Sequence, residues 1–498
     1  MAQLDGSAAE VLLAPGVVLR APGLVGTAEI RVPGPALVRG RSTPATEGFA
    51  AALARAELIP RQVVELAVSQ QVGAPPAPAL TTRGGRPGME LQVPAPGAGF
   101  GQVLLLSDEH GVMSWHYPQA RPSAAPAARG STVDRFVIPS DSARSAAADG
   151  GTAASRSLLT LVGKKLLSVL VYPLVEGLIA KASLEVARRW ELENRPSRLR
   201  TFNPGEQSQP PGSPFAQTDV ARLAEGRSLL FLHGVFSTSH GSFGGLSDQT
   251  LSTLHQAYSG RVFAFDHPTL SVNPADNASA LLDLLPAGQT FDIDIVCHSR
   301  GGLVARVLAG ELGARPGLRV HRVIFVGTPN AGTAILTTDH IVDLLDRFTS
   351  LLNLLPPGPW TMVVDVLDAV LEVVKVVGQG AVAGLIGLSC MATGSTFVKG
   401  LNAAGVVPAE YYAVDANYQP TGGLALLCRA GNVAVDLVFG GVANDVAVPS
   451  SGVGTVTGDD MFPVDPRNTL SFGPDEGVWH CSYFQQPKTE AALVNWLQ

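Results

Sequence analysis

The sequence predicts an α/β protein: a mostly parallel central sheet with flanking helices and a helical insertion, preceded by a β-rich accessory region. Two observations lead to this prediction. From residue 227 onward, short apolar runs alternate with helical patterns, and that alternation implies β-α-β units with parallel strands. Before residue 150, short β-like runs are separated by segments rich in Ala, Gly and Pro, which favours a small β-rich domain.

Length and composition limit the classes of protein to which this chain can belong. A chain of 498 residues is long enough for two or three units. With 46% hydrophobic and 15% charged residues, it can bury a large core. A net charge of −7 without any basic cluster argues against nucleic acid as a partner. The four cysteines have no paired metal spacing and are too sparse for a disulfide framework, so we expect a reducing compartment.

Membrane and targeting signals are weak. The first ten residues lack a basic region followed by an apolar core, so we predict no secretory signal. Leu166–Ala180 is short and contains Pro173, and charged residues interrupt Met362–Leu388, so neither reads as an integral span. We therefore expect a soluble, cytoplasmic protein. Ser157–Leu192 is expected to pack on the protein, with a peripheral membrane contact as the alternative.

The order along the chain suggests three segments. Residues 1–150 form the β-rich accessory region, 151–213 a linker and long helix, and 214–498 the α/β domain with a helical cap at about 335–401. The β-like runs of the first segment are Gly16–Leu19, Thr27–Val32, Leu91–Val93, Val103–Leu106 and Val112–His116. A helix is expected within Arg41–Gln71, and one long helix, or two broken near Pro173, over Ser157–Leu192. No partner is specified for the accessory region.

The third segment shows the most regular pattern. Strands are expected at Ser228–Leu232, Arg261–Phe265, Phe291–Cys297, Val320–Val326, Glu410–Val414 and Val433–Phe439. Asn273 and Pro274 are typical of a helix start, as cap and first-turn residue, and Thr489–Leu497 reads as a final helix. In parallel sheets, sites lie at the carboxyl ends of strands. Each motif described below follows such an end.

The motif with the clearest chemistry is Cys297-His298-Ser299-Arg300-Gly301, between an expected strand and an expected helix. It is a variant of the G-x-S-x-G nucleophile elbow, a sharp turn that exposes a serine hydroxyl at the positive end of the following helix. Gly301 and Gly302 provide the small residues that the close chain crossing needs, while Cys297 replaces the first glycine. The structural alternative is an ordinary turn serine before a helix.

At this point residues 225–498 resemble the lipase and esterase branch of the α/β-hydrolase family. In that family the order along the chain is serine, acid, then histidine. His480 is the only histidine after residue 340, so it is the candidate base, with a structural role as the alternative. The stretch Asn444–Pro449 resembles the family's Asn-Asp-x-x-Val-Pro loop, which makes Asp445 the candidate acid. Competing carboxylates are Asp415, Asp436, Asp459 and Asp460.

The resemblance also implies an oxyanion hole made of backbone amides. One donor would be the amide of Arg300, after the nucleophile. The other would lie in the loop His233-Gly234-Val235-Phe236, with Val235 as donor and Phe236 as the adjacent possibility. His233, Gly234 and His298 are expected to position the loop and pocket. For the Arg300 side chain, pairing with a surface acid is expected.

Two further segments follow strands in the α/β domain. Gly327–Thr333 resembles a lipase segment and is expected to form pocket wall. Asp266 and His267 follow a strand at the same edge of the sheet, and we expect them to fix a loop by hydrogen bonds.

The cap has broad apolar faces, notably over Val363–Val374, so its helices should cover something. In the resembled family a lid over the acyl pocket sits here, and a rigid helical cap is the alternative. The resemblance implies a serine hydrolase of carboxylic esters, with lipid-like esters as the expected class and no metal or organic cofactor. Acyl transfer, thioester hydrolysis and an inactive binding or scaffolding module remain alternatives.

Overall fold

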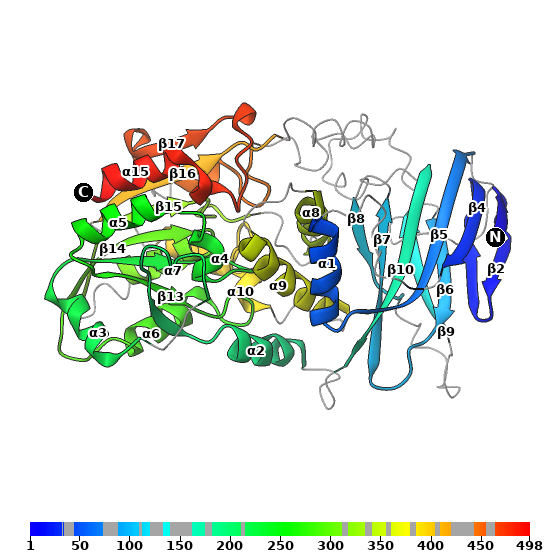
Figure 1. The fold of residues 1–498 in the computed structure, drawn as a ribbon, viewed down its shortest axis with the longest axis horizontal. Helices are drawn as coiled ribbons and strands as arrows, with labels where there is room; N and C mark the ends of the chain where they lie inside the picture. Colours follow the sequence, from blue (N-terminus) through cyan, green and yellow to red (C-terminus); the bar gives the residue numbers. More distant parts are fainter. Residues whose placement is uncertain are drawn as a thin grey trace.

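The computed structural model describes most of the chain. The described residues are 1–31, 33, 44–72, 88–108, 112–119, 133–139, 162–174, 182–210, 215–310, 317–333, 341–354, 360–378, 385–403, 409–419, 443–454 and 464–498. Strands of the amino-terminal part lie at one end of the elongated molecule, the mixed sheet lies at the other, and helices lie between them (Figure 1).

The amino-terminal part is a sandwich of two antiparallel sheets. The six-stranded sheet has the order β1 (Ala2–Asp5), β4 (Leu24–Arg31), β5 (Ile59–Gln71), β10 (Gly163–Pro173), β7 (Phe100–Asp108) and β8 (Met113–His116). The four-stranded sheet has the order β2 (Glu10–Ala14), β3 (Val17–Arg20), β6 (Gly88–Pro94) and β9 (Val133–Pro139). Side chains of both sheets meet in one buried cluster. The predicted β-rich region is therefore confirmed as a sandwich.

Of the two helices predicted in this part, one is confirmed and the other is wrong. The helix expected within Arg41–Gln71 is α1 (Pro44–Arg55), and strand β5 follows it in the same segment. The long helix expected over Ser157–Leu192 is a strand, β10, at Gly163–Pro173, and α2 begins only at Ala182. Strand β10 is central and buried on both faces. Such a strand is a continuous apolar run that periodicity does not separate from a buried helix.

The seven-stranded sheet of the carboxyl-terminal part carries the candidate site. Its order is β11 (Arg198–Thr201), β13 (Val262–Asp266), β12 (Ser228–Leu232), β14 (Phe291–His298), β15 (Leu318–Val326), β16 (Glu410–Ala416) and β17 (Thr469–Phe472). Only the edge strand β11 is antiparallel to its neighbour. The predicted parallel sheet is confirmed. The expected strand Val433–Phe439 lies outside the described residues.

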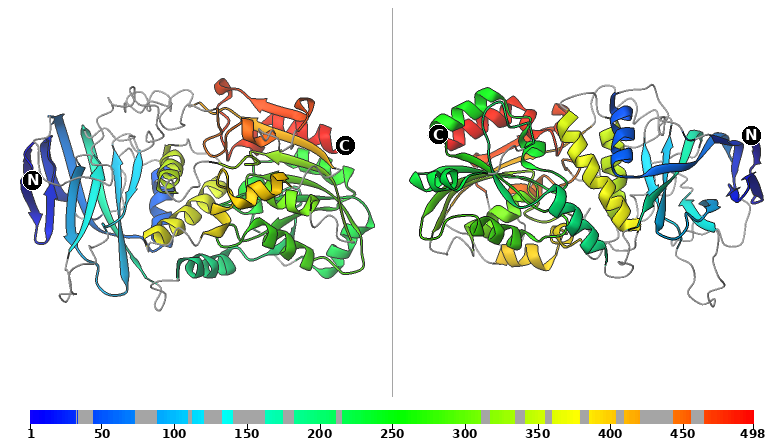
Figure 2. Two further views of the ribbon diagram at one scale, coloured as in Figure 1. Left: turned by 180° about the vertical axis from the view of Figure 1, so that it is seen from behind. Right: turned by 60° about the horizontal axis from the view of Figure 1, so that its bottom comes forward.

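Helices cover both faces of this sheet, as Figures 1 and 2 show. Residues 229 and 231 of β12 point to one buried cluster and residues 230 and 232 to another. Helices α5 and α15 pack on the first side, and α6 and α7 on the second. The flanking helices and short turns are α3 (Gln217–Arg222), η2 (Leu223–Glu225), α4 (Ser239–Phe243), α5 (Asp248–Ala257), α6 (Pro274–Asp283), α7 (Gly301–Ala309), α14 (Ser451–Gly454), η5 (Pro466–Asn468), η6 (Pro474–Glu476), η7 (Tyr483–Gln485) and α15 (Pro487–Leu497). Asn273 caps α6, as predicted.

The insertion after β15 is helical in its described parts: α8 (Ile341–Leu354), α9 (Trp360–Gly378), α10 (Ile386–Ser389) and α11 (Thr396–Ala403). Helices α1, α8 and α9 lie between the sandwich and the seven-stranded sheet, while α2 (Ala182–Asn194) runs along one side (Figures 1 and 2). Their apolar side chains join one cluster with β7 and β8. Among the described helices, none has the length and apolar character needed to cross a membrane.

Candidate active site

The turn between β14 and α7 holds Ser299 in a left-handed backbone conformation, with φ of +52°. Its amide donates to the carbonyl of Val326 at 2.9 Å, which fixes the turn against β15. A Cβ atom at Gly301 would lie 2.2 Å from the carbonyl oxygen of Leu232. A Cβ at Gly302 would lie 2.2 Å from the Thr328 side chain. The chain crossing therefore requires glycine at both positions, as expected of a nucleophile elbow.

Cys297 takes the place of the first glycine of the elbow motif. Its side chain is fully buried, and its thiol donates to the carbonyl of Ile324 at 3.2 Å. Burial raises the pKa of this thiol well above its usual value. The substitution therefore adds a buried, protonated side chain beside the elbow.

Asp445 and His480 form a direct pair. The Nδ1–H of His480 donates to Oδ2 of Asp445 at 2.8 Å, and both side chains are buried. Oδ1 of Asp445 accepts from the amides of Ala447 and Val448 at 3.0 and 2.7 Å. Burial raises the pKa of Asp445, but the His480 contact and these amides outweigh it and lower the pKa overall. The acid is thus held as a carboxylate against the histidine.

Tyr483 is a fourth donor to Asp445 that sequence reasoning missed. Its hydroxyl donates to Oδ2 at 2.9 Å. Burial raises the pKa of Tyr483 far above its usual value, so the hydroxyl keeps its proton. Tyr483 lies three residues after His480 in a 3₁₀ turn, and nothing in the local sequence pattern marks it as a partner of Asp445.

Asp415, a competing acid, does not contact the histidine. It accepts a hydrogen bond from Ser471 at 3.0 Å, and burial raises its pKa to about 6. The other three alternatives, Asp436, Asp459 and Asp460, lie outside the described residues.

Ser299 and His480 line the same pocket. Ser299 lies at the carboxyl end of β14, and His480 belongs to the loop before α15. His480 uses Nδ1 for its bond to Asp445, and among the described residues no hydrogen bond joins Oγ of Ser299 to Nε2 of His480. The remaining lining comes from the loop after β12 and the adjoining α4, the end of β14, the segment after β15, the cap, and the loops that carry Asp445 and His480. These residues are Val235, Phe236, Ser237, Gly241, Ser242, His298, Pro329, Thr333, Phe348, Val366, Met391, Ala447, Val448 and Cys481.

The loop after β12 approaches the elbow closely. A Cβ at Gly234 would lie 2.7 Å from Cβ of Ser299, so only glycine fits there. Nδ1–H of His233 donates to the carbonyl of Gly234 at 2.9 Å. The peptide bond is trans, so the amide of Val235 points away from His233. The amides of Val235, Phe236 and Arg300 donate to no described residue, which leaves them available for an oxyanion.

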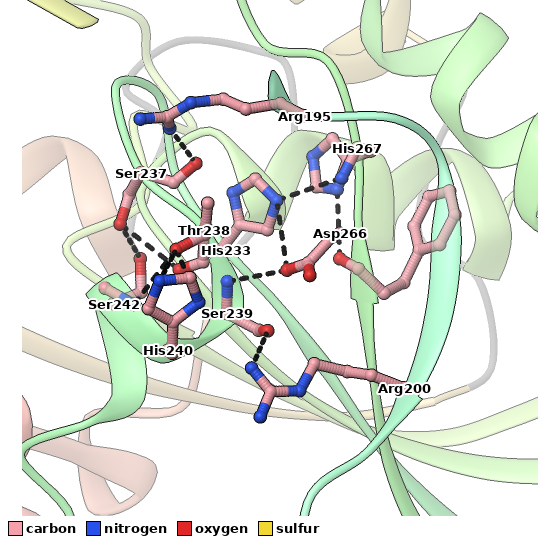
Figure 3. A network of polar contacts seen from close by, with 12 residues as sticks. Arg195, Arg200, His233, Ser237, Thr238, Ser239, His240, Ser242, Asp266 and His267 are labelled. Carbon is pink, nitrogen blue, oxygen red and sulfur yellow. Dashed lines mark hydrogen bonds and ion pairs between the residues drawn. The ribbon is translucent and has the colours of Figure 1, made fainter. Parts of the chain in front are cut away.

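His233 belongs to a buried polar network beneath this loop (Figure 3). Its Nε2 accepts from the amide of His267 at 3.0 Å, and the two rings stack with centroids 4.1 Å apart. Burial lowers the pKa of His233 to about 4, so it is neutral at pH 7. Asp266 accepts from the amide of Ser239 at 2.8 Å. The expectation that Asp266 and His267 fix a loop agrees with these contacts.

His298 connects the two halves of the site. One ring nitrogen, Nε2, donates to the carbonyl of His480 at 2.8 Å, and Nδ1 lies 3.3 Å from the hydroxyl of Ser242. Ser242 in turn lies 3.5 Å from the amide of Gly234. Burial lowers the pKa of His298 to about 3, so the ring is neutral. This side chain therefore fixes the loop that carries His480 relative to the loop after β12.

The expectation for the Arg300 side chain is wrong. It is fully buried, and it donates to the carbonyls of Gly387 and Val272 and to Oδ1 of Asn277. Burial lowers its pKa. The three acceptors belong to the cap and to the segment around the start of α6, so Arg300 joins the elbow to both. The apolar neighbours of Arg300 in the sequence give no sign of these distant acceptors.

Glu191 is a second buried charge that the sequence pattern does not reveal. This residue of α2 accepts from the backbone amides of Thr269, Leu270 and Ser271. It fixes the loop after β13, next to the network of Figure 3. Among the described residues, no group of three or more His, Cys, Asp or Glu side chains is arranged to hold a metal ion.

The sheet order, the crossover helices and the elbow after β14 together define the α/β-hydrolase fold for the carboxyl-terminal part. Within that class, residues 194–498 match the family model described as "Domain of unknown function (DUF7379)". The chain belongs to this family.

Solved structures with similar folds include three lipases or phospholipases. The mature lipase BlEst2 of Bacillus licheniformis is 21% identical, with a TM-score of 0.32 over 54% of this chain and 91% of that one. Phospholipase PlaB of Legionella pneumophila is 15% identical, with a TM-score of 0.35 over 55% and 60%. Lipase 1 of Pelosinus fermentans is 12% identical, with a TM-score of 0.33 over 54% and 97%. A search of curated proteins returns no match. We therefore base the chemistry on this chain's own residues.

Proposed function

We propose that the protein is a serine hydrolase acting on carboxylic esters, with Ser299 as nucleophile, His480 as base and Asp445 as the acid that orients it. The observation behind this proposal is the hydrogen bond between Asp445 and His480, because His480 lines the same pocket as Ser299, a serine on a strained elbow. A serine hydroxyl becomes an effective nucleophile when such a base takes its proton.

The proposed acylation step uses these three side chains and two backbone amides. Oγ of Ser299 attacks the ester carbonyl carbon while its proton passes to Nε2 of His480. The oxygen becomes an oxyanion, which the amides of Val235 and Arg300 stabilise. The tetrahedral intermediate then collapses: the carbon–oxygen bond to the alcohol breaks, and His480 gives its proton to the departing alkoxide. An acyl-enzyme remains on Ser299.

Deacylation repeats these steps with water. His480 takes a proton from the attacking water, the same amides hold the second oxyanion, and Ser299 leaves with the proton returned by His480. Asp445 stays ionised throughout and stabilises the imidazolium. An alcohol or thiol in place of water would give acyl transfer by the same route, and a thioester would be cleaved with a thiol as leaving group.

The pocket lining favours an apolar acyl group. Phe236, Phe348, Val366 and Met391 contribute large apolar side chains to it. An apolar wall next to the nucleophile stabilises a hydrocarbon chain by excluding water from it. We therefore propose lipid-like esters as the substrate class, with the cap acting as a cover for the acyl chain.

A fluorophosphonate probe tests the proposal. The hydroxyl of an activated serine attacks the phosphorus and fluoride leaves, so the folded wild-type protein is expected to be labelled once. Ser299→Ala should abolish both labelling and the hydrolysis of p-nitrophenyl esters, while a far-ultraviolet circular dichroism spectrum shows that the fold is kept. Absence of labelling in folded wild-type protein would contradict the proposal and favour a binding module.

A further inference from the structure

Helix α8 of the cap covers the open edge of the six-stranded sheet. Strand β8 is the last strand of that sheet, and among the described residues no strand pairs with the other side of its backbone. The hydroxyl of Ser350 accepts from the amide of Met113 at 2.9 Å and donates to the carbonyl of the same residue at 3.1 Å. Figure 1 shows α8 beside this strand. The helix thus satisfies backbone groups that an edge strand would leave open.

Trp115 strengthens the same contact. Its amide donates to Oδ1 of Asp346 at 2.7 Å, and its indole N–H donates to the hydroxyl of Thr349 at 3.0 Å. Trp115 and Thr349 are both buried. Four hydrogen bonds therefore hold α8 on β8, and most of them lie in a place where an unpaired group is costly.

The other side of α8 reaches the candidate active site. At about 100° per residue, Phe348 lies roughly 200° around the helix from Asp346. Its ring packs edge-on against Phe236, with centroids 6.0 Å apart. Phe348 and Phe236 both line the pocket that contains Ser299. Helix α8 is therefore held between the sandwich and the loop after β12.

Phe236 has a strained backbone conformation in that loop. It has φ of +58°, a left-handed conformation that is unfavourable for a non-glycine residue and persists only where its surroundings hold it. It directly follows Val235, the proposed oxyanion donor. A ring packed against Phe236 therefore restrains the backbone that carries this amide.

We propose that the amino-terminal sandwich is a positioning element of the active site: through β8 and α8 it holds Phe348, which fixes Phe236 in the oxyanion loop and sets the length of acyl chain that the pocket accepts. This inference rests on the proposed function. Phe348 acts as a pocket wall that determines specificity, while Trp115, Thr349 and Ser350 are positioning residues that act through it.

The test measures the rate constant for labelling by fluorophosphonates that carry a short or a long alkyl chain, using the full-length protein. Phe348→Ala should slow labelling by the short-chain probe about tenfold, a part of the 100- to 1,000-fold cost of losing an oxyanion donor. The ratio of long-chain to short-chain rates should rise, because the missing ring opens space. Thr349→Val keeps the pocket lining. It should also slow labelling by the short-chain probe and raise the ratio of long-chain to short-chain rates, but by smaller factors than Phe348→Ala.

Tyr117→Phe is the matched control. It removes one hydrogen bond between the sandwich and the cap, from the Tyr117 hydroxyl to the carbonyl of Val374, without touching α8. Its rate constants should equal those of the wild type. A purely structural role of the α8 contacts would lower the fraction labelled and leave the rate constants and their ratio unchanged. That result overturns the inference, whereas an unlabelled wild type contradicts the proposed function itself.

Discussion

Two buried aspartate–histidine pairs lie at the carboxyl ends of strands in the same sheet, yet they are built for different tasks. In the pair Asp445–His480, the histidine donates directly to the carboxylate at 2.8 Å. In the pair Asp266–His233, Nε2 of the histidine lies 4.0 Å from Oδ1 of the carboxylate. His233 instead uses one nitrogen to donate to the Gly234 carbonyl and the other to accept from the His267 amide.

The comparison indicates that a histidine can act as a general base only if one ring nitrogen is left unbonded, and that a nearby carboxylate alone is not enough. Both nitrogens of His233 are bound to backbone, so this ring can fix a loop but has no lone pair left for a substrate proton. Nε2 of His480 is bonded to no described residue, and it faces the pocket of Ser299. A general base must offer such an atom within reach of the proton that it takes.

The largest difference between the two pairs is expected when each histidine is replaced in turn. His480→Ala should lower kcat for a p-nitrophenyl ester by about 10⁴- to 10⁶-fold, because the base is lost. His233→Asn should lower kcat by about 100-fold at most, because this change alters only the orientation of the Val235 amide. Equal losses for the two variants, with both proteins folded, would remove the distinction.

Removing each carboxylate sharpens the comparison further. Asp445→Asn should lower kcat by about 10⁴-fold, because the amide no longer stabilises the imidazolium or selects its tautomer. Asp266→Asn keeps an oxygen for the Ser239 amide, so kcat should change little and the free energy of unfolding should fall by about 1 kcal/mol. Steady-state kinetics and urea denaturation measure the two effects, and a large kcat loss in Asp266→Asn would count against the assignment.

The smallest effect is expected at Asp415, which belongs to neither pair. Its folded-state pKa of about 6 lies above the unfolded value of about 3.9. Its contribution to stability is therefore fully present below pH 3.9 and is lost as the pH rises through 6. Asp415→Asn should leave kcat near the wild-type value and should be more favourable for stability at pH 8 than at pH 5. Urea denaturation at both values checks this, and an activity loss matching that of Asp445→Asn would show that the wrong acid was chosen.

The sheet of the carboxyl-terminal part could be predicted because its strands are short and separated by clear helix signals. Asn273 and Pro274, for example, mark the start of α6. In the sandwich, β10 could not be told from a helix. It is covered on one face by the other sheet and on the opposite face by cap helices, so apolar residues point to both sides of the strand.

The candidate site was predicted where the chain's local pattern is specific. The elbow and the Asn444–Pro449 loop carry their own motifs, and His480 had no rival late in the chain. The contacts of Tyr483, Glu191 and Arg300 were missed because each joins segments far apart in sequence, and no local pattern encodes such a pairing. Phe348 was hidden for the same reason within an apolar helix.

The contact of Glu191 with the loop Thr269–Ser271 bears on how the two halves of the chain could be separated. Strand β11, at residues 198–201, completes the edge of the seven-stranded sheet, and Glu191 lies before it on α2. A fragment that begins near residue 210 would therefore lack an edge strand and leave three loop amides in the interior without their acceptor. Excision of an autonomous carboxyl-terminal fragment should begin upstream of α2.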